Sequence, residues 1–285
     1  MHRHHTFLLT SMSTLLAIAN ATQASPVIAY WDFNNQSGSN VTDVSVNNRI
    51  GTLEGSATLS AGGAGHSGGA NDRALVLNAT NGSQMRVPIA EFDGYSPGTD
   101  SYSVSFWVKR NSATTQGGGL FDFNASTTQS FQAEIGNAGN LNFLVGSTGV
   151  GGGGTSWSQM QLPNGTISDT EWHHIVSVID RSGPNPIFLL YVNGNLTVPT
   201  YPFTGLPPSS FGSVTFNHDL LIGQLNNGFN FQGMIDDLAI YSIALTDAQV
   251  AGLANRTLTP LDVPEPASLT LLGMGTLLMA RRRRG

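Results

Sequence analysis

The chain has 285 residues, no cysteine and only 11% charged residues, while 40% of its residues are hydrophobic. The missing cysteines exclude disulfides and thiolate metal sites, and low charge with ample hydrophobic content argues against a disordered chain. Five of the 12 basic residues lie at the two ends, so the body between them carries 7 basic and 17 acidic residues. Because nucleic-acid binding requires a basic face, we expect no nucleic-acid partner.

Residues 1–24 have the features of a secretory signal peptide. Arg3 precedes an apolar run over residues 7–18, and small residues follow this run. A cut after Ala21 would use an A-x-A pattern, and Ala24 offers a second position, so both remain open. The apolar run is too short for a stable membrane span. We therefore expect an exported protein that signal peptidase cleaves.

From residue 27 to residue 241 the sequence alternates between strand and turn signals. Runs of β-branched and aromatic residues are bounded by Gly, Pro and Asn, as in an all-β protein. The predicted strands cover residues 27–33, 52–53, 74–77, 85–88, 103–109, 131–135, 141–145, 157–162, 175–179, 187–192, 196–198, 220–223 and 231–241. The glycine-rich stretches 117–119 and 146–155 are interpreted as loops, since neither continues into the Gly-Lys-Ser/Thr of a phosphate-binding loop.

Local signals refine three of these predictions. In the strand 103–109, strict alternation places Phe106 on the core face. Asn193-Gly194 has the residue types of a tight hairpin turn. After the last strand, Thr246 as N-cap and Gln249 three residues later form a capping box and predict a short helix.

Five motifs then occur in the order found in one family. They are Y-W-D-F-N at 30–34, D-x-S-x-N at 43–47, S-F-W-V-K at 105–109, W-H-H with L-Y-V-N-G within 172–194, and F-x-G-x-I-D-D at 231–237. This order resembles the bacterial laminin-G-like, or concanavalin A-like, domains. The resemblance implies a jelly-roll β-sandwich of two antiparallel sheets over residues 25–255, followed by a linker over 256–263. It implies no activity, because one fold hosts many functions.

The carboxy-terminal tail combines three features over residues 264–285. Pro264, Glu265 and Pro266 precede fourteen uncharged residues, and Arg281, Arg282, Arg283 and Arg284 follow them. Terminal arginines hold the cytoplasmic end of a membrane segment, although fourteen residues fall short of the roughly 20 of a full span. The arrangement resembles the PEP-CTERM sorting signal. The resemblance implies a transmembrane sorting helix, a transient stay in the inner membrane of a Gram-negative bacterium, and processing by an exosortase.

A metal site is the one piece of chemistry that the strands suggest. Asp236 is two residues before Leu238, so alternation places it on the inward face, where a carboxylate needs a cation, an arginine or backbone donors. Laminin-G-like domains often carry calcium, which binds carboxylate, amide and carbonyl oxygens. The candidate calcium ligands are Asp32, Asp43, Asn48 and Asp236. The alternatives are that Asp236 caps a bulge or pairs with Arg49 or Arg86.

Catalysis is not expected. A retaining glycosidase needs two carboxyl groups close together on one strand face, whereas Glu54, Glu91, Glu134, Glu171 and Glu265 are each isolated. His173 and His174 have no serine in a nucleophile context, so we interpret them as core or turn residues.

The expected role is that of an exported, non-catalytic binding or structural protein of the cell surface or extracellular matrix. Carbohydrate binding is one candidate, with an extracellular polysaccharide as partner, and Trp157 and Tyr201 near loops are the candidate stacking residues. Trp31, Trp107 and Trp172 are expected in the core. The sequence does not identify ligand-binding residues. A divergent polysaccharide hydrolase and a structural matrix protein without a ligand are the alternatives.

Overall fold

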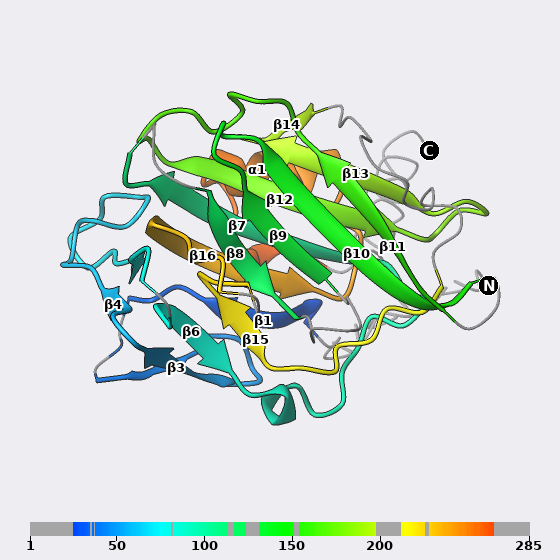
Figure 1. The fold of residues 1–285 in the computed structure, drawn as a ribbon, viewed down its shortest axis with the longest axis horizontal. Coiled ribbons are helices and arrows are strands. Elements are labelled where there is room, and N and C mark those ends of the chain that lie inside the picture. The colour runs from blue at the N-terminus through cyan, green and yellow to red at the C-terminus, as the bar shows by residue number, and fades with distance from the viewer. Residues whose placement is uncertain are drawn as a thin grey trace, which may run out of the picture.

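A computed structural model describes residues 25–264, apart from residues 35, 37, 81, 113–116, 124–130, 151–153, 198–211 and 226–227 and the side chains of residues 147–150 and 154–158. In this part the chain forms a sandwich of two eight-stranded antiparallel sheets, sheet A and sheet B (Figure 1). The expected all-β sandwich is confirmed. The predicted signal peptide and sorting helix lie outside the described residues, and none of the helices within them has the length and apolar character needed to cross a membrane.

Sheet A joins the two ends of the folded chain. Its order is β14 (Asn195–Thr197), β13 (Ile187–Val192), β12 (His173–Asp180), β7 (Tyr102–Arg110), β16 (Gly233–Tyr241), β5 (Leu75–Leu77) and β4 (Thr58–Leu59). The first strand, β1 (Val27–Trp31), pairs with the last strand, β16. The two ends of the folded chain therefore lie side by side in this sheet.

Sheet B contains the remaining strands. Its order is β11 (Gly154–Gln161), β10 (Leu141–Val150), β9 (Phe131–Ile135), β8 (Gly118–Asp122), β15 (Leu220–Ile222), β6 (Gln84–Val87), β3 (Ile50–Glu54) and β2 (Asn40–Thr42). The paired strands of this sheet are antiparallel.

The interpretation of the glycine-rich stretches as loops is wrong for residues 118–119 and for the parts of 146–155 that the structure describes. Gly118 and Gly119 lie in β8, and β10 and β11 extend into the second stretch. A Cβ on Gly118 would lie 2.3 Å from the Cα of Phe231, and one on Gly119 would lie 2.4 Å from the amide nitrogen of Leu225. Glycine is therefore used here for the close approach of two backbones and not for flexibility.

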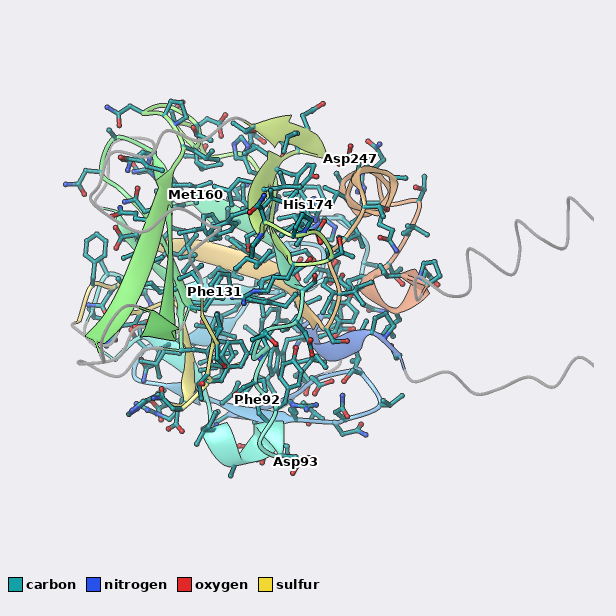
Figure 2. The ribbon with its side chains drawn as sticks, turned by 90° about the vertical axis from the view of Figure 1, so that its right-hand side faces the viewer. Phe92, Asp93, Phe131, Met160, His174 and Asp247 are labelled. Carbon is teal, nitrogen blue, oxygen red and sulfur yellow. The ribbon has the colours of Figure 1, made fainter. Side chains whose placement is uncertain are left out.

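The main core fills the space between the sheets. Alternation along β7 directs Phe106 inward, as predicted, and its ring meets the ring of Phe121 at a centroid distance of 5.7 Å. Phe121 in turn packs on Phe131 at 5.1 Å. Figure 2 shows Phe131 between the two layers and Asp247 at the helix in the upper right of the view. The two sheets are thus held together by aromatic and β-branched side chains from both inner faces.

The outer face of sheet A carries a second, smaller core beneath α1 (Asp247–Ala254). The capping box predicted at Thr246 is present, since its Oγ1 accepts from the Gln249 backbone and Gln249 Oε1 accepts from the Thr246 backbone. Val250 and Leu253 of the helix pack on strand side chains of this face. Tyr191 on β13 donates to Asp247 Oδ1 at 2.6 Å, which fixes the start of the helix on the sheet.

The segment expected to be a linker is packed on the same face. Residues 257–264, here called the C-terminal strap, follow α1 and include the short 3-10 helix η3 (Pro260–Asp262). Val263 is only 3% exposed and belongs to the core beneath α1. The Gln249 amide also donates to the carbonyl of Pro264 at 3.2 Å. The folded body therefore continues up to the first residue of the predicted sorting motif.

We predict that Phe106→Ala lowers the free energy of unfolding by about 3–5 kcal/mol, because it leaves a cavity between two rigid sheets. Leu196→Ala is the control, since Leu196 is 53% exposed and its truncation should change stability by less than about 0.5 kcal/mol. Urea unfolding of both variants followed by tryptophan fluorescence measures the difference. Equal stability of the two variants would contradict the placement of the core.

Candidate functional site

A β-bulge in β16 reverses the predicted orientation of Asp236. Asp236 pairs with Trp107 of β7, but Ala239 pairs with Ser105, so β16 carries one extra residue between these pairs. Asp237 occupies this position with φ of 47°, a left-handed conformation that is uncommon for aspartate. Ile235 and Leu238 consequently both point into the main core. The prediction that Asp236 shares the inward face with Leu238 is wrong, and Asp236 lies on the outer face of sheet A.

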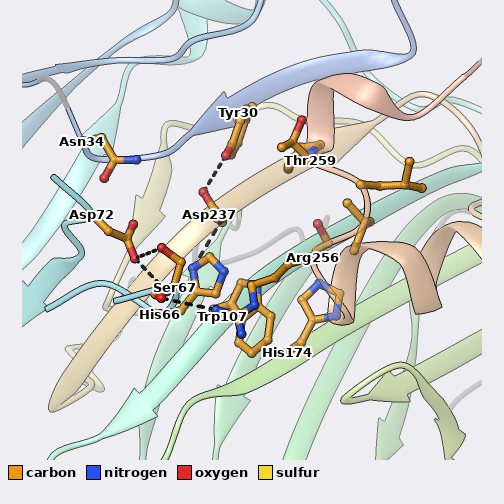
Figure 3. A pocket seen from close by; sticks show the side chains of 14 residues that line it. Tyr30, Asn34, His66, Ser67, Asp72, Trp107, His174, Asp237, Arg256 and Thr259 are labelled. Carbon is orange, nitrogen blue, oxygen red and sulfur yellow. Dashed lines mark hydrogen bonds and ion pairs between the residues drawn. The ribbon is translucent and has the colours of Figure 1, made fainter. Parts of the chain in front are cut away.

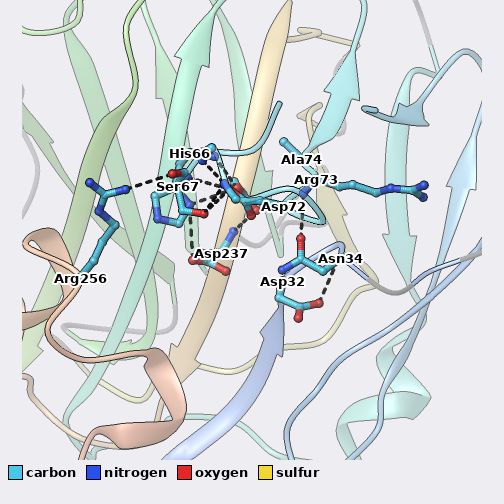
Figure 4. A network of polar contacts seen from close by, with 12 residues as sticks. Asp32, Asn34, His66, Ser67, Asp72, Arg73, Ala74, Asp237 and Arg256 are labelled. Atoms are coloured by element: carbon cyan, nitrogen blue, oxygen red, sulfur yellow. Dashed lines mark hydrogen bonds and ion pairs between the residues drawn. The ribbon is translucent and has the colours of Figure 1, made fainter. Parts of the chain in front are cut away.

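Asp236 is nevertheless fully buried, because the loop between β4 and β5 folds over it. In this loop, residues 60–74, the His66 backbone N–H donates to Asp236 Oδ2 at 2.8 Å, and His66 Nδ1 lies 3.1 Å from the same oxygen. Asp72 supports the loop from within: its Oδ2 accepts from Ser67 N and Ser67 Oγ, both at 2.7 Å. The loop therefore brings a histidine and a further carboxylate onto the bulge (Figure 4).

A pocket of about 210 Å³ opens above this bulge (Figure 3). Sheet A supplies its floor, the loop 60–74 supplies one wall, and α1 with the C-terminal strap supplies the other. Its lining residues are Tyr30, Asn34, His66, Ser67, Asp72, Ser105, Trp107, His174, Asp237, Leu253, Arg256, Leu258, Thr259 and Pro260. Arg256 bridges the two walls, since its Nη1 donates to the carbonyl of Ser67 at 3.3 Å.

Aromatic rings fix the position of His66 in the pocket. Its ring stacks on Trp107 with a centroid distance of 4.3 Å and an interplanar angle of 18°. Trp172 approaches the same ring edge-on at 6.4 Å. His174 lies against Trp107 at 5.0 Å. The imidazole of His66 is therefore held in one orientation, facing the carboxylates of the bulge.

The electrostatics of the pocket are dominated by three carboxylates. Among the described residues, His66 is the only group in ion-pair contact with Asp236 and Asp237. Its Nδ1 lies 3.1 Å from Asp236 Oδ2 and 3.5 Å from Asp237 Oδ2, and no described Lys or Arg forms an ion pair with either carboxylate. Burial, and then the charge of Asp236, raise the pKa of Asp237 to about 7. Burial also raises the pKa of Asp236. Tyr30 donates to Asp237 Oδ1 at 2.6 Å, and burial raises its pKa, so its phenol keeps the proton that it donates.

His174 is the second buried histidine of the pocket. It is 2% exposed, and burial together with nearby His66 lowers its pKa to about 3. Its Nδ1 meets no hydrogen-bond partner among the described residues. The ring therefore stays neutral at physiological pH and retains an unshared nitrogen at the pocket.

The four predicted calcium ligands do not come together. Asp43 caps its own turn, accepting from Ser45 N at 2.7 Å and from Arg49 N at 2.6 Å. Asn48 is exposed, and its amide donates to a carbonyl two residues earlier. Asp32 accepts from the backbone of Asn34 at 3.1 Å. The residues that converge on Asp236 are instead His66 and Asp72, and ligand atoms of the three lie within 4.8 Å of one another.

The two arginines considered as partners of Asp236 are engaged elsewhere. Arg86 pairs with Glu54 at 2.9 Å and Asp219 at 3.3 Å, and Arg49 lies over the ring of Phe92. Sequence reasoning missed His66 and Asp72, because they sit in a glycine-rich loop without strand or helix periodicity. A lone histidine flanked by glycines and followed by Asp72 was the available signal.

The tryptophans are divided between core and pocket. Trp31 is fully buried in the main core, as expected. Trp107 and Trp172 are only half-buried, because both lie beside His66 on the outer face of sheet A, so their placement in the core is wrong. The side chain of Trp157 and the whole of Tyr201 lie outside the described residues.

We predict opposite pH dependences of stability for Asp237→Asn and His174→Gln. The raised pKa of Asp237 makes stability fall between about pH 4 and 7, since the unfolded chain has already lost that proton. The lowered pKa of His174 makes stability rise between about pH 3 and 6.5, since the unfolded chain then binds a proton that the folded chain excludes. The two effects oppose each other in the unsubstituted protein.

Removing Asp237 should therefore expose the rise of stability with pH, and removing His174 should expose the fall. Urea unfolding at a series of pH values between 4 and 7, in the presence of a chelator, measures both profiles. Profiles that stay parallel to that of the unsubstituted protein would contradict the assigned protonation states.

Comparison with known proteins agrees with this architecture. No curated protein matches the chain. Among solved structures, the receptor-binding domain of botulinum neurotoxin D superimposes with a TM-score of 0.61 at 14% identity, covering 81% of this chain and 53% of that one. The binding domain of Paraclostridial Mosquitocidal Protein 1 gives 0.59 at 17% identity, covering 81% and 52%. The ligand-binding domain of botulinum neurotoxin serotype D in complex with N-acetylneuraminic acid gives 0.59 at 16%, covering 81% and 51%.

The chain thus spans about half the length of these neighbours, and at such identities the likeness shows the fold alone. Two family models match the sequence itself. Residues 262–284 match the PEP-CTERM protein-sorting motif, which indicates an exported protein. Residues 78–251, more than half of the chain, match a laminin-G-type model, and the chain therefore belongs to the concanavalin A-like lectin/glucanases superfamily.

Proposed function

We propose that this exported binding-type protein is a non-catalytic carbohydrate-binding module, presented at the bacterial surface or in the extracellular matrix. The observation that carries the proposal is the pocket on the outer face of sheet A. Its volume of about 210 Å³ is below the range of about 300–1,000 Å³ typical of drug-sized ligands. It therefore suits a single sugar unit at the end or side of a polysaccharide.

The chemistry of the pocket rim supports a polyhydroxylated ligand. Asn34, Thr259 and Arg256 offer an amide, a hydroxyl and a guanidinium, and Asp237 offers a carboxylate oxygen. Sugar hydroxyls donate to and accept from such groups, and hydrogen bonds to charged partners are the strongest of them. One neighbour of similar fold, of which this chain covers 51%, has been solved in complex with N-acetylneuraminic acid.

We predict that residues 25–264 retain a subset of glycans on an array, that Arg256→Ala weakens this retention about tenfold or more, and that Asn34→Ala weakens it by a smaller factor. The loss at Arg256 corresponds to roughly 1.5–3 kcal/mol for a hydrogen bond to a charged group, and the loss at Asn34 to roughly 0.5–1.5 kcal/mol for one to a neutral amide. Ile187→Ala is the control, because Ile187 is an exposed residue of β13 that does not line the pocket. Unchanged retention by both pocket variants would contradict the pocket as the sugar site.

Two further outcomes separate the alternatives. Release of reducing sugar from a retained polysaccharide would favour a hydrolase. Absence of retention together with self-association of the protein would favour a structural matrix protein.

We also infer that an exosortase processes the chain at Pro264, Glu265 and Pro266. The matched sorting motif includes Asp262 and Val263, which belong to the packed C-terminal strap. The peptidase therefore approaches a motif whose first residues are held by the folded body. Release of the strap should make the motif more accessible.

We predict that Val263→Asp accelerates processing, because a carboxylate cannot remain in the apolar core beneath α1 and the strap should detach. Leu261→Asp is the matched control in the same strap, since Leu261 is 48% exposed. Pulse–chase conversion of precursor to product in a host that makes an exosortase measures the rates. Equal rates for the two variants would contradict a role of the strap in access, and conversion of a Glu265→Ala variant would contradict the motif itself.

A further inference from the structure

We propose that His66, Asp72 and Asp236 form a binding site for a divalent transition-metal ion of the Zn²⁺ class. Ligand atoms of the three side chains lie within 4.8 Å of one another. Around a tetrahedral ion with bonds of about 2.0–2.2 Å, ligand atoms are separated by roughly 3.4 Å. Small side-chain rotations therefore suffice to bring the three ligand atoms within bonding distance of one ion.

The hydrogen bonds of the cluster leave room for the ion. Asp236 Oδ2 accepts from the His66 backbone at 2.8 Å and faces His66 Nδ1 at 3.1 Å, so an ion can take the place of the proton between these two atoms. Asp72 Oδ2 accepts three hydrogen bonds from Ser67 and Gly68, whereas its Oδ1 accepts none from the described residues. Each of the three side chains thus has one atom to offer.

The charge balance of the pocket also calls for a cation. Asp72, Asp236 and Asp237 place three carboxylates around one imidazole, and Asp237 Oδ2 lies 3.5 Å from His66 Nδ1. Arg256 also lines the pocket, but its Nη1 donates to the carbonyl of Ser67 and not to a carboxylate. Buried carboxylates of this kind are stabilised by pairing or by coordination of a metal. A divalent ion would offset the negative charge of these carboxylates. Asp237 could then serve as a further ligand or accept a hydrogen bond from a water bound to the ion.

A second buried histidine lines the same pocket. His174 is 2% exposed, lines this pocket, and keeps an Nδ1 without a partner among the described residues. Burying an imidazole nitrogen without a hydrogen bond is costly. His174 and His66 both contact Trp107, so His174 is placed beside the three ligands and is not counted among them.

The donor set selects the class of ion. Calcium takes six to eight oxygen ligands, whereas an imidazole nitrogen with carboxylates suits Zn²⁺ and related ions. The stacking of His66 on Trp107 holds the imidazole in place, as the outer groups of metal sites do. The calcium ion that the sequence suggested is therefore the competing occupant, and one arm of the test addresses it.

The test is titration of the full chain, purified and stripped of metal, with Zn²⁺ alone and in parallel with Ca²⁺ alone. We expect one Zn²⁺ per chain by calorimetry, a rise in melting temperature, and a Ca²⁺ affinity at least about 100-fold weaker. His66→Gln, Asp72→Asn and Asp236→Asn should each weaken Zn²⁺ binding by about 100-fold or more. Loss of a residue that only supports a metal ligand already lowers metal affinity by about 10–100-fold, and loss of a ligand itself should cost at least as much. Substitution by Co²⁺ should give visible absorption bands that the three variants lose.

A glycine pair keeps the test valid if a ligand variant fails to fold. A Cβ on Gly65 would lie 2.4 Å from Asp72 Cγ, so Gly65→Ala should displace Asp72 and weaken Zn²⁺ binding. A Cβ on Gly69 would meet only ordinary contacts of 3.4 Å or more, so Gly69→Ala should bind normally. Tighter binding of Ca²⁺ than of Zn²⁺ would overturn the proposal. So would a Zn²⁺ ion that persists in all three ligand variants, since it would lie elsewhere, for example on His2, His4 and His5.

Discussion

Two adjacent aspartates in the middle of a sheet impose the constraint on which the outer face of this sandwich depends. A regular strand would send Asp236 and Asp237 to opposite faces and leave one carboxylate among the aromatic rings of the main core. The extra residue at the bulge keeps the core apolar, since Ile235 and Leu238 both point inward. Both carboxylates are then turned away from the main core, and the molecule has to satisfy them there with His66, Tyr30 and backbone donors.

The rest of the pocket follows from this need. The loop 60–74 covers the bulge because its backbone and His66 supply partners to Asp236 Oδ2, whereas the strand itself supplies only the Asp237 N–H to Oδ1. The C-terminal strap closes the other side, and Arg256 ties it to the loop through the carbonyl of Ser67. Three segments far apart in the sequence therefore meet over one irregularity of β16. A ligand that binds here contacts all three, so binding would also influence how firmly the strap is held.

The position of the strap connects the site with the sorting signal. Val263 lies in the core beneath α1 and Gln249 holds the carbonyl of Pro264, so the folded body ends where the sorting motif begins. No free spacer separates the described body from the first residue of that motif.

By itself, the sequence determined the regular parts of this protein. Period-two alternation identified most strands and the inward face of Phe106, Thr246 with Gln249 identified the helix start, and the order of five motifs identified the family. These signals are local, so they can be read from neighbouring residues. Only the tertiary structure decided the candidate site. A single inserted residue at Asp237 reverses a face that alternation predicts, and the approach of Phe231 turns a glycine-rich stretch into β8. His66 and Asp72 gain their meaning only when their loop folds over a carboxylate about 170 positions away, a contact that no local pattern records.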